Sequence, residues 1–581
     1  MERKEIAKVL EEVGTLLELK GENPYKIRAY QQAARIVLQL EGDPAELAES
    51  GQLEKVKGIG KALSGKITEL VTTGRLEYLN RLKKSFPPGL FDLLRIQGLG
   101  PKKIKILYED LGVNNLGELE YACLENRLIS LKGFGKKTQD NVLKGIQTLK
   151  KYRGYFLWSE AEAPALKLIS TLKACPAVNR VEPAGDFRRL NEVVNNIILV
   201  AESEATEDVV RFIKDSGVVE SVESFKVRDA SWLRLGLDSG LLAQVHLTPR
   251  EKFPFAWYYL TGSGEHIASM RQRAELRKLN LGPEGLSDKG GRIRSVSDEA
   301  AVFAELDLPW IDPELREGWG EIEAAEEGRL PELVRLSEVK GIFHVHSNYS
   351  DGGLSIAEAV SWCQKHGYEY LGLTDHSRSA AYANGLSLEE LQNQFEEVEE
   401  IRGQYPDFGL FWGIESDILA DGSLDYPDDV LARFDFVIAS VHSAFKLTEK
   451  EMTARLIRAV QNPYTTILGH PTGRLLLARE PYAVDLPAVL AAAAENGTAV
   501  EINANPHRLD LDWREMKRAK SLGLKLMICP DAHSAEGLTH VRYGVQAARK
   551  GWLTASDILN CLNRHEMTRF LKNLKDSRKK A

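Results

Sequence analysis

Cysteine is scarce in this chain: its 581 residues include five, at positions 123, 175, 363, 529 and 561, and no two form a Cys-x-x-Cys pair. This odd, scattered set excludes a disulfide framework and a thiolate zinc finger, and it is typical of a reducing cytoplasm. No segment has the roughly 18 uncharged apolar residues of a membrane span. Residues 1–14 alternate charged and apolar side chains, which predicts an amphipathic helix and not a signal peptide. We therefore expect a cytoplasmic protein without a membrane partner.

The composition, 43% hydrophobic and 28% charged, excludes wholesale disorder. At roughly 150 residues per domain, the length predicts about four domains. Charge is distributed unevenly, because residues 1–153 hold 27 Lys+Arg and 20 Asp+Glu whereas the remainder holds 49 and 64. A polyanion would meet the N-terminal quarter first. This excess indicates either a nucleic-acid-binding face or a merely solvated one.

Residues 1–150 have helical periodicity, interrupted by three turns of one pattern: VKGIGKAL (56–63), IQGLGPKKI (96–104) and LKGFGKKT (131–138). Paired glycines allow a tight turn and close backbone approach to a ligand, and the helix that follows favours an anion at its start. These turns resemble the helix-hairpin-helix motif, which grips the DNA backbone without reading sequence. The resemblance implies DNA binding by Gly58, Gly60, Lys61, Gly98, Gly100, Lys102, Lys103, Gly133, Gly135 and Lys136.

Two later stretches, PAGDFRRLNEVVNNIILVAE (183–202) and LLAQVHLTPREKFPFAWYYLTGSGEH (241–266), resemble the family X DNA polymerases. With the helical N-terminus, the resemblance covers residues 1 to about 320. In that family the first stretch is a Gly-Ser turn, two arginines and a strand ending Asp-x-Asp. The second stretch supplies a third Asp, and the three carboxylates hold two Mg²⁺ ions. The frame is present in Gly185, Arg188, Arg189 and Glu192.

The polymerase chemistry is missing from this frame. The Asp-x-Asp positions fall on Asn196 and Ile198, the third Asp falls on Gln244, and the turn serine falls on Asp186. Amides and an isoleucine lack the charge that two Mg²⁺ ions need, and Asp186 would repel a triphosphate. We therefore expect a degenerate, inactive polymerase site on a palm retained for shape or DNA docking.

Lys66 matches another functional position of the family. Some members use a lysine in the helix after the first turn as a Schiff-base nucleophile that removes 5′-deoxyribose phosphate. Such chemistry needs a lysine that loses its proton easily, through burial or neighbouring cations. Lys66 is thus a possible lyase residue, and a simple phosphate contact is the alternative.

An acidic connection rich in Pro and Gly (310–335) precedes seven short apolar strands separated by helical stretches, which predicts a parallel α/β barrel. The expected strands are 341–346, 370–376, 409–417, 434–442, 465–470, 498–504 and 524–533. Six of them end in His, Asp or Glu, and side chains at such ends point into the barrel mouth. The candidate metal ligands are His344, His346, Asp351, His376, Glu415, His442, His470, Asp531 and His533.

Imidazole and carboxylate together suit zinc, manganese or iron better than magnesium. Nine ligands exceed the need of one metal, so we expect two or three divalent ions, Mn²⁺ and/or Zn²⁺ with Fe as an option. Water bridging two such ions could attack phosphorus. Arg474 and Arg378 follow two of the ligands in sequence and could hold a substrate phosphate or form surface ion pairs; Asn505 and Arg508 are further candidates.

The series HVH–SDG–TDH–GIESD–SVH–GHPTGR–PDAHS, from residue 340 to about 570, resembles the PHP (polymerase and histidinol phosphatase) superfamily. PHP domains are phosphoesterases on a distorted (β/α)7 barrel. Together with the preceding resemblance, this matches the architecture of bacterial family X polymerases. There the PHP domain is a manganese-dependent 3′–5′ exonuclease, and in some members it also removes 3′-phosphates and opens abasic sites.

The resemblances imply a DNA end-processing nuclease of DNA repair, which we expect to be a monomer. An active repair polymerase with proofreading and a DNA-binding scaffold without chemistry are the alternatives. The expected multidomain fold combines helical helix-hairpin-helix domains, an α+β palm and thumb, and the barrel. The expected boundaries are 1–80 (lyase-like), 81–153 (fingers-like), 154–250 (palm), 251–320 (thumb), 321–338 (linker) and 339–581 (PHP barrel).

Overall fold

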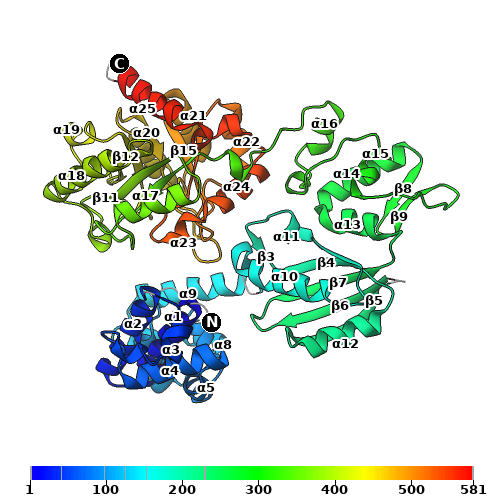
Figure 1. Ribbon diagram of the computed structural model, residues 1–581, viewed down its shortest axis with the longest axis horizontal. Coiled ribbons are helices and arrows are strands. Elements are labelled where there is room, and N and C mark those ends of the chain that lie inside the picture. The colour runs from blue at the N-terminus through cyan, green and yellow to red at the C-terminus, as the bar shows by residue number, and fades with distance from the viewer. Residues whose placement is uncertain are drawn as a thin grey trace. The chain divides into compact units, whose positions relative to one another are not determined.

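The computed structural model describes residues 3–40, 42–96, 98–124, 126–151, 154–227 and 230–578. The chain divides after residue 153 into a helical unit and a larger α/β unit (Figure 1). Within the described residues, none of the helices combines the length and the apolar character that a membrane span requires.

The first unit is helical, as the periodicity predicts. Its helices are α1 (Arg3–Lys20), α2 (Pro24–Leu38), α3 (Pro44–Glu49), α4 (Lys61–Thr73), α5 (Glu77–Lys84), α6 (Leu90–Leu93), α7 (Pro101–Leu111), α8 (Leu116–Leu124) and α9 (Lys136–Lys151). Local signals fix their ends: Asn23 caps α2 ahead of Pro24, and left-handed glycines end α4 and α7. One continuous apolar core joins these helices, so the three glycine turns are presented on a single packed scaffold.

The second unit begins with a five-stranded sheet in the order β2-β4-β7-β6-β5, in which only β4 and β7 pair in parallel. The strands are β2 (Arg180–Ala184), β4 (Asn196–Glu202), β5 (Val219–Val227), β6 (Ala230–Leu237) and β7 (Leu242–Thr248). Helices α10 (Trp158–Lys173), α11 (Gly185–Arg188) and α12 (Thr206–Ser216) and the short pair β1 (Phe156–Leu157) and β3 (Val193–Val194) accompany the sheet. This is the expected α+β palm.

A small subdomain follows the palm, with its own apolar core. It contains α13 (Phe253–Thr261), α14 (Gly264–Leu276), the hairpin β8 (Leu279–Gly282) and β9 (Gly285–Asp288), α15 (Glu299–Ala304) and α16 (Glu321–Glu326). A buried ion pair joins it to the palm turn (residues 185–192): Arg188 donates to both carboxylate oxygens of Glu299, at 2.8 and 2.6 Å. Within the subdomain, Arg316 donates to Glu299 at 2.5 Å.

The C-terminal part is a parallel seven-stranded barrel in sequential order, as predicted. Its strands are β10 (Gly341–Val345), β11 (Tyr370–His376), β12 (Gly409–Asp417), β13 (Phe436–Ser440), β14 (Ile467–Leu468), β15 (Ala499–Asn503) and β16 (Leu526–Cys529). The accompanying helices are α17 (Ile356–Lys365), α18 (Leu388–Gln404), α19 (Asp428–Leu431), α20 (Glu449–Gln461), α21 (Leu486–Glu495), α22 (Trp513–Ser521), α23 (Ala535–Leu538), α24 (Val541–Lys550) and α25 (Arg564–Arg578).

The barrel closes incompletely between β10 and β16. At the mouth, the backbone bridges the gap, because His346 N–H donates to Ala532 O at 2.9 Å and Ala532 N–H donates to His344 O at 3.0 Å. Lower down, the Asn560 side chain fills the seam. Its amide donates to the carbonyls of Gly341 and Ile528, and its oxygen accepts from the N–H of Ile528. The Asn560 side chain thus makes hydrogen bonds across this gap that two paired strands would otherwise make.

The floor of the barrel is apolar. Phe343, Tyr370, Phe411 and Phe436 pack together inside it, with ring centroids 4.6 to 5.9 Å apart. Glycines on neighbouring strands leave room for the rings, since a Cβ at Gly372 would lie 2.4 Å from Phe343. This floor separates the polar mouth from α25, whose Met567 and Leu571 join the same apolar cluster.

Candidate metal centre

The nine predicted ligands lie together at the carboxyl ends of the barrel strands. Their ligand atoms form three groups, in each of which all atoms are within 4.8 Å of one another. The groups are His346, Asp351, His376 and His533; His344, His346 and Asp531; and His376, Glu415 and His442. The remaining residue, His470, has its Nε2 atom 3.1 Å from a Glu415 oxygen. His346 and His376 each belong to two groups, so the cluster is continuous.

Glu415 lies at the centre of this cluster. One carboxylate oxygen is 3.3 Å from Nε2 of His344 and 3.2 Å from Nε2 of His442. The other is 3.0 Å from Nδ1 of His376. The side chain is 1% exposed, so Glu415 is a buried acceptor surrounded by imidazoles. A carboxylate in this place can bridge two cations.

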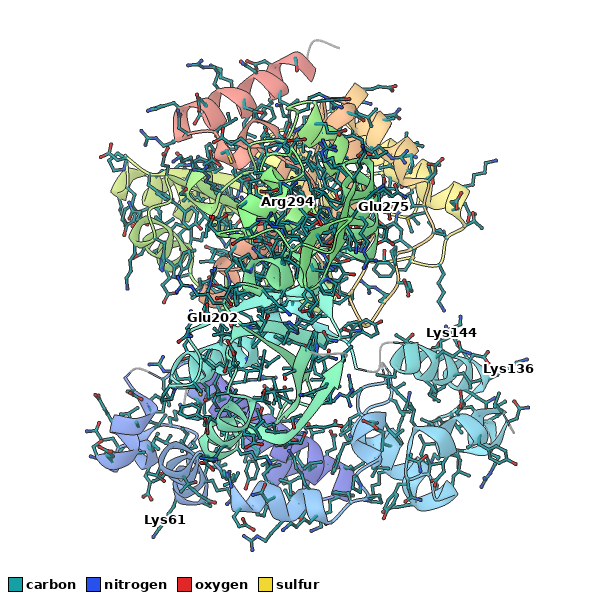
Figure 2. All side chains as sticks on the ribbon, turned by 90° about the vertical axis from the view of Figure 1, so that its right-hand side faces the viewer. Lys61, Lys136, Lys144, Glu202, Glu275 and Arg294 are labelled. Carbon is teal, nitrogen blue, oxygen red and sulfur yellow. The ribbon has the colours of Figure 1, made fainter. Side chains whose placement is uncertain are left out.

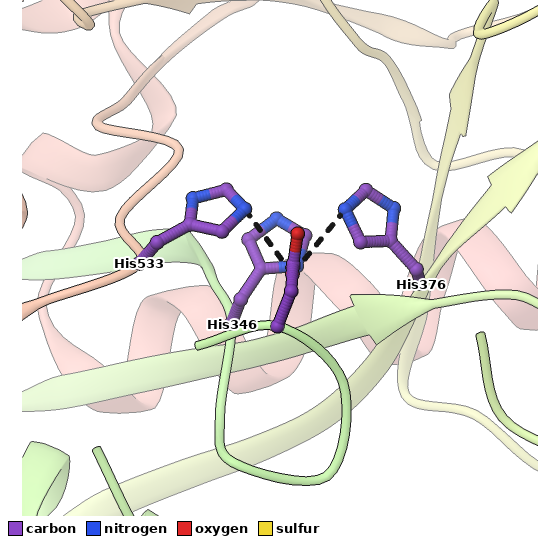
Figure 3. Close-up of side chains that lie close together, drawn as sticks. His346, His376 and His533 are labelled. Atoms are coloured by element: carbon purple, nitrogen blue, oxygen red, sulfur yellow. Dashed lines mark ion pairs between the residues drawn. The ribbon is translucent and has the colours of Figure 1, made fainter. Parts of the chain in front are cut away.

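Asp351 contributes a second carboxylate, from the rim. Figure 3 shows the rings of His376, His346 and His533 converging on one point. There an Asp351 oxygen is 3.6 Å from Nε2 of His376 and 3.3 Å from Nε2 of His533. The turn that carries Asp351 is tight, because a Cβ at Gly352 would lie 2.2 Å from the His346 carbonyl oxygen. Asp351 is 33% exposed and opens this side of the cluster to solvent.

Left-handed backbone conformations orient two of the candidate ligands. His344 has φ +64° and Asp531 has φ +52°, a region that L residues rarely adopt. The pairing of β10 with β11 shifts between Ile342 and Val345. This bulge turns both Phe343 and His344 inward, although neighbours in a regular strand point to opposite faces. Such strain is concentrated at functional sites.

Several buried atoms in the cluster have no hydrogen-bond partner in the described part of the chain. They are Nε2 of His344, both ring nitrogens of His346, Nδ1 of His470 and one oxygen of Glu415. Leaving a buried polar atom unsatisfied costs roughly 1–3 kcal/mol, and metal coordination removes that cost. Imidazole nitrogens and carboxylate oxygens also match the donor preferences of divalent transition metals. The residues therefore fit divalent cations.

The electrostatics of the cluster favour positive charge beside its carboxylates. Burial opposes ionisation of Glu415, but His442 and His344 outweigh it and hold the pKa of that carboxyl well below its usual range. Burial, reinforced by His533, lowers the pKa of His346 to about 3 and leaves this imidazole neutral at pH 7. Burial likewise opposes charge on His442, but Glu415 and Asp417 raise its pKa to about 10. This imidazole therefore holds a proton at pH 7, which a bound cation would displace. Strongly ionised carboxylates and a neutral imidazole in one buried cluster favour cation binding.

Two outer carboxylates were not predicted from the sequence. Glu501 lies 2.5 Å from Nδ1 of His344 and accepts a hydrogen bond from the backbone N–H of His470 at 2.5 Å. Asp417 lies 2.6 Å from Nδ1 of His442. Carboxylates placed behind ligand histidines fix the tautomer and the ring orientation. A sequence signal existed for Glu501, which is a buried charge on β15, the one strand whose end carries no ligand.

The arginines differ from one another in their surroundings. Arg474 is buried: it donates to the carbonyl of Arg508 at 2.9 Å, to the carbonyl of Leu509 and to Asp512. These contacts hold the loop at residues 508–512, and phosphate binding by Arg474 stays a prediction. Arg378 donates to the carbonyl of Asp425 at 3.0 Å. Arg508, by contrast, has its Nε atom 3.6 Å from Asp531 and lies beside the cluster.

The three glycine turns share one geometry. The first glycines, Gly58, Gly98 and Gly133, have φ of +96°, +81° and +87°. The second glycines, Gly60, Gly100 and Gly135, immediately precede α4, α7 and α9, and a Cβ there would meet nothing within 4 Å. Lys61 and Lys136 project outward from the ribbon in Figure 2. Exposed helix N-termini flanked by lysines are suited to phosphate.

The comparisons with known proteins agree with these domains. Residues 1–76 match the helix-hairpin-helix domain family and residues 90–148 match the SAM-like helix-hairpin-helix tandem family. Residues 256–317 match the DNA polymerase beta thumb, and residues 343–505 match the PHP domain. Over 573 residues, 98% of this chain and 100% of the relative, the sequence is 35% identical to the DNA polymerase/3′-5′ exonuclease PolX of Bacillus subtilis (strain 168). The chain belongs to the bacterial family X DNA polymerases with a C-terminal PHP domain.

Part of this family X chain also resembles smaller proteins. A probable phosphatase of Thermoanaerobacter sp. (strain X514) is 28% identical over 232 residues, which are 37% of this chain and 88% of the relative. Another, from Caldanaerobacter subterraneus subsp. tengcongensis, is 29% identical over 205 residues, 33% of this chain and 74% of the relative. Both alignments cover most of the relative and a minor part of this chain.

The positions that the resemblance assigns to the polymerase carboxylates lie on two neighbouring strands of the palm. Ile198 on β4 is in register with Gln244 on β7, and Asn196 begins the same strand. Ile198 packs against the apolar cluster that includes Phe253. Asp186 accepts a hydrogen bond from Asn191 Nδ2 at 2.8 Å and pairs with Arg189. At these positions the palm therefore carries an apolar side chain, two amides and an ion-paired aspartate.

Lys66 lies within a small aromatic cluster of the helical unit. Its Nζ atom is 4.9 Å from the ring centroid of Tyr78 and 6.0 Å from that of Tyr30, and it donates to the Ala62 carbonyl at 3.3 Å. Lys26 also lies over Tyr78, at 5.7 Å. These contacts bring two cations and two phenols together and leave lyase chemistry and phosphate contact both open.

Proposed function

We propose that this chain is a DNA-binding, metal-dependent phosphoesterase that acts as a 3′–5′ exonuclease and DNA end-processing nuclease. The observation that carries the proposal is the convergence of nine candidate ligand side chains at the barrel mouth. Within the described residues, Nε2 of His344, both ring nitrogens of His346 and Nδ1 of His470 are buried there without a hydrogen-bond partner. Divalent ions held there, Mn²⁺ or Zn²⁺ by the donor set, would activate water near neutral pH and neutralise charge on a phosphoester.

The chain's own residues would divide the work as follows. Glu415, buried among five imidazoles, would fix the spacing of the ions, with Asp351 completing the set from the rim. Arg508, beside Asp531, would hold a non-bridging phosphate oxygen as the substrate enters. The glycine turns and their lysines would hold the DNA backbone. The likeness to probable phosphatases favours 3′-phosphate removal as a second reaction of the same site.

We propose further that the palm does not synthesise DNA. The residues Asn196, Ile198 and Gln244 support this, because none of them offers the negative charge that binds Mg²⁺, and Ile198 is packed in an apolar cluster. The name of the Bacillus subtilis relative includes DNA polymerase, so synthesis with proofreading is the rival function.

One experiment separates the two functions. The purified chain is given a labelled primer–template with Mn²⁺ or Mg²⁺, with and without deoxynucleoside triphosphates. We expect primer shortening with Mn²⁺ and no primer extension under either metal. Template-directed extension that persists in the His344→Ala variant would overturn the proposal for the palm. Absence of shortening in metal-loaded protein would overturn the nuclease.

A further inference from the structure

The palm and the barrel are joined by a carboxylate that the polymerase frame supplies. Glu192 lies on the palm turn and is 8% exposed. It accepts hydrogen bonds from two barrel residues at the start of α22: Trp513 Nε1 at 3.0 Å and Arg514 Nη1 at 2.7 Å. Its backbone carbonyl accepts from Trp158 N–H at 3.0 Å. Glu192 is therefore held by the palm and is directed at the barrel.

The contacts continue from there toward the metal centre. Arg514 also donates to Asp512 at 3.0 Å, and Asp512 accepts from Arg474. Arg474 in turn donates to the carbonyls of Arg508, at 2.9 Å, and Leu509. A chain of charge-assisted contacts thus runs from the palm to the loop that ends β15. Such contacts are stronger and more directional than neutral hydrogen bonds.

Arg508 is the side chain that this loop presents at the barrel mouth. Its Nε atom lies 3.6 Å from Asp531, and its side chain is 20% exposed. Within the described residues, Asp531 is its only ion-pair partner. The loop is bent sharply beside it, since Leu509 has φ +42°, a conformation that persists only when the surroundings enforce it. The guanidinium therefore has donors available at the place where a phosphodiester would approach the metals.

We propose that Glu192 is a positioning residue of the nuclease: through Arg514, Asp512 and Arg474 it holds the loop that directs Arg508 at the substrate phosphate. This inference rests on the proposed function of the barrel. In this proposal the palm has a role that does not require nucleotide addition, because the palm supports the phosphate-binding loop of the neighbouring domain.

The chain provides a matched control for this reasoning. Glu162, also in the palm, forms a second ion pair with the barrel, donated by Arg542 at 2.8 and 2.6 Å. That pair reaches α24, and within the described residues none of its hydrogen bonds leads to Arg508. Glu162→Ala and Glu192→Ala therefore remove ion pairs of the same kind between the same two parts. They differ in whether the Arg508 loop loses its support.

The test uses the full-length chain loaded with Mn²⁺ and the p-nitrophenyl ester of thymidine 5′-monophosphate, a small phosphodiester that does not depend on the DNA-binding turns. We expect Glu192→Ala to raise KM about tenfold with little change in kcat, as loss of one charged phosphate contact would. Arg508→Ala should behave alike, and the double variant should be no worse than Arg508→Ala alone. Glu162→Ala should stay within about twofold of wild type. Bound manganese should be unchanged throughout.

Further variants guard against a folding defect. Glu192→Gln keeps an acceptor for Trp513 and should restore part of the KM, and Arg514→Ala, on the outer side of the contact, should reproduce Glu192→Ala. Equal effects of Glu162→Ala and Glu192→Ala, or additive effects of Glu192→Ala and Arg508→Ala, would overturn the inference. If the metal-loaded wild type does not hydrolyse the ester or DNA, the proposed nuclease fails instead.

Discussion

Replacing Glu501 by glutamine should weaken metal binding without touching a metal ligand. The side chain is fully buried and makes two short contacts of 2.5 Å, to Nδ1 of His344 and to the N–H of His470. Glutamine keeps the shape but removes the charge, and its amide nitrogen must face one of these two donors. In either orientation His344 loses the charged partner that keeps its Nε2 atom directed at Glu415 and Asp531.

The expected size follows from such outer carboxylates, whose loss weakens metal affinity by roughly 10- to 100-fold. That range corresponds to about 1.4–2.7 kcal/mol. The assay is equilibrium dialysis against graded chelator, with metal per chain measured by mass spectrometry. Glu495→Gln, an exposed change at the end of α21, is the control and should retain metal as the wild type does. Wild-type chelator resistance in Glu501→Gln, with an unchanged circular dichroism spectrum, would refute the reasoning.

Three more outcomes are expected. Alanine at a candidate ligand should lower nuclease activity at least a hundredfold, which corresponds to about 2.7 kcal/mol, and should leave DNA binding nearly unchanged. The variants to measure are His344→Ala, Asp351→Ala and Asp531→Ala. Nuclease activity that persists in metal-free protein would contradict the proposed site. Valine at the second glycine of a turn should weaken salt-sensitive DNA binding about tenfold or more, because one phosphate contact is lost. The control Gly403→Val in the barrel should leave DNA affinity unchanged. If the triple variant Gly60→Val, Gly100→Val, Gly135→Val binds DNA as the wild type does, the turns are purely structural. Burial lowers the pKa of His246 to about 4, so the unfolded chain binds a proton at this residue before the folded chain does as the pH falls from 6.5 to 4. The free energy of unfolding should therefore decrease by about 3 kcal/mol over that window. In His246→Gln the melting temperature should depend less steeply on pH there, and an unaltered slope would count against this reasoning.

The sequence was sufficient for the barrel because its signals are local. Seven apolar runs of strand length, each followed by a helix, specify parallel strands, and His or carboxylate at the run ends marks the mouth. All seven strands form where these patterns indicate, and the nine candidate ligand side chains lie together at the barrel mouth. The glycine turns were equally readable, since left-handed φ at Gly58, Gly98 and Gly133 is what the repeated Gly-x-Gly pattern requires.

The parts that could not be predicted depend on contacts between distant residues. Arg474 follows a ligand closely in sequence, yet its guanidinium turns to carbonyls 34 and 35 residues away. His344 reaches the cluster only because a bulge reverses the alternation of β10. Glu192 belongs to the polymerase frame by its motif, but its partners lie 321 and 322 residues later. Spacing along a chain carries no information about such encounters.

The seam filled by Asn560 has a practical consequence for cutting the chain. The recognisable PHP segment stops at residue 505, ahead of β16 and of the ligands Asp531 and His533. Even a fragment that ended after β16 would lack the side-chain amide of Asn560, whose hydrogen bonds connect Ile528 on β16 to Gly341 on β10. A barrel produced on its own must therefore extend through α25. Truncation of its first or of its last segment would remove the Asn560 contacts that join β10 to β16.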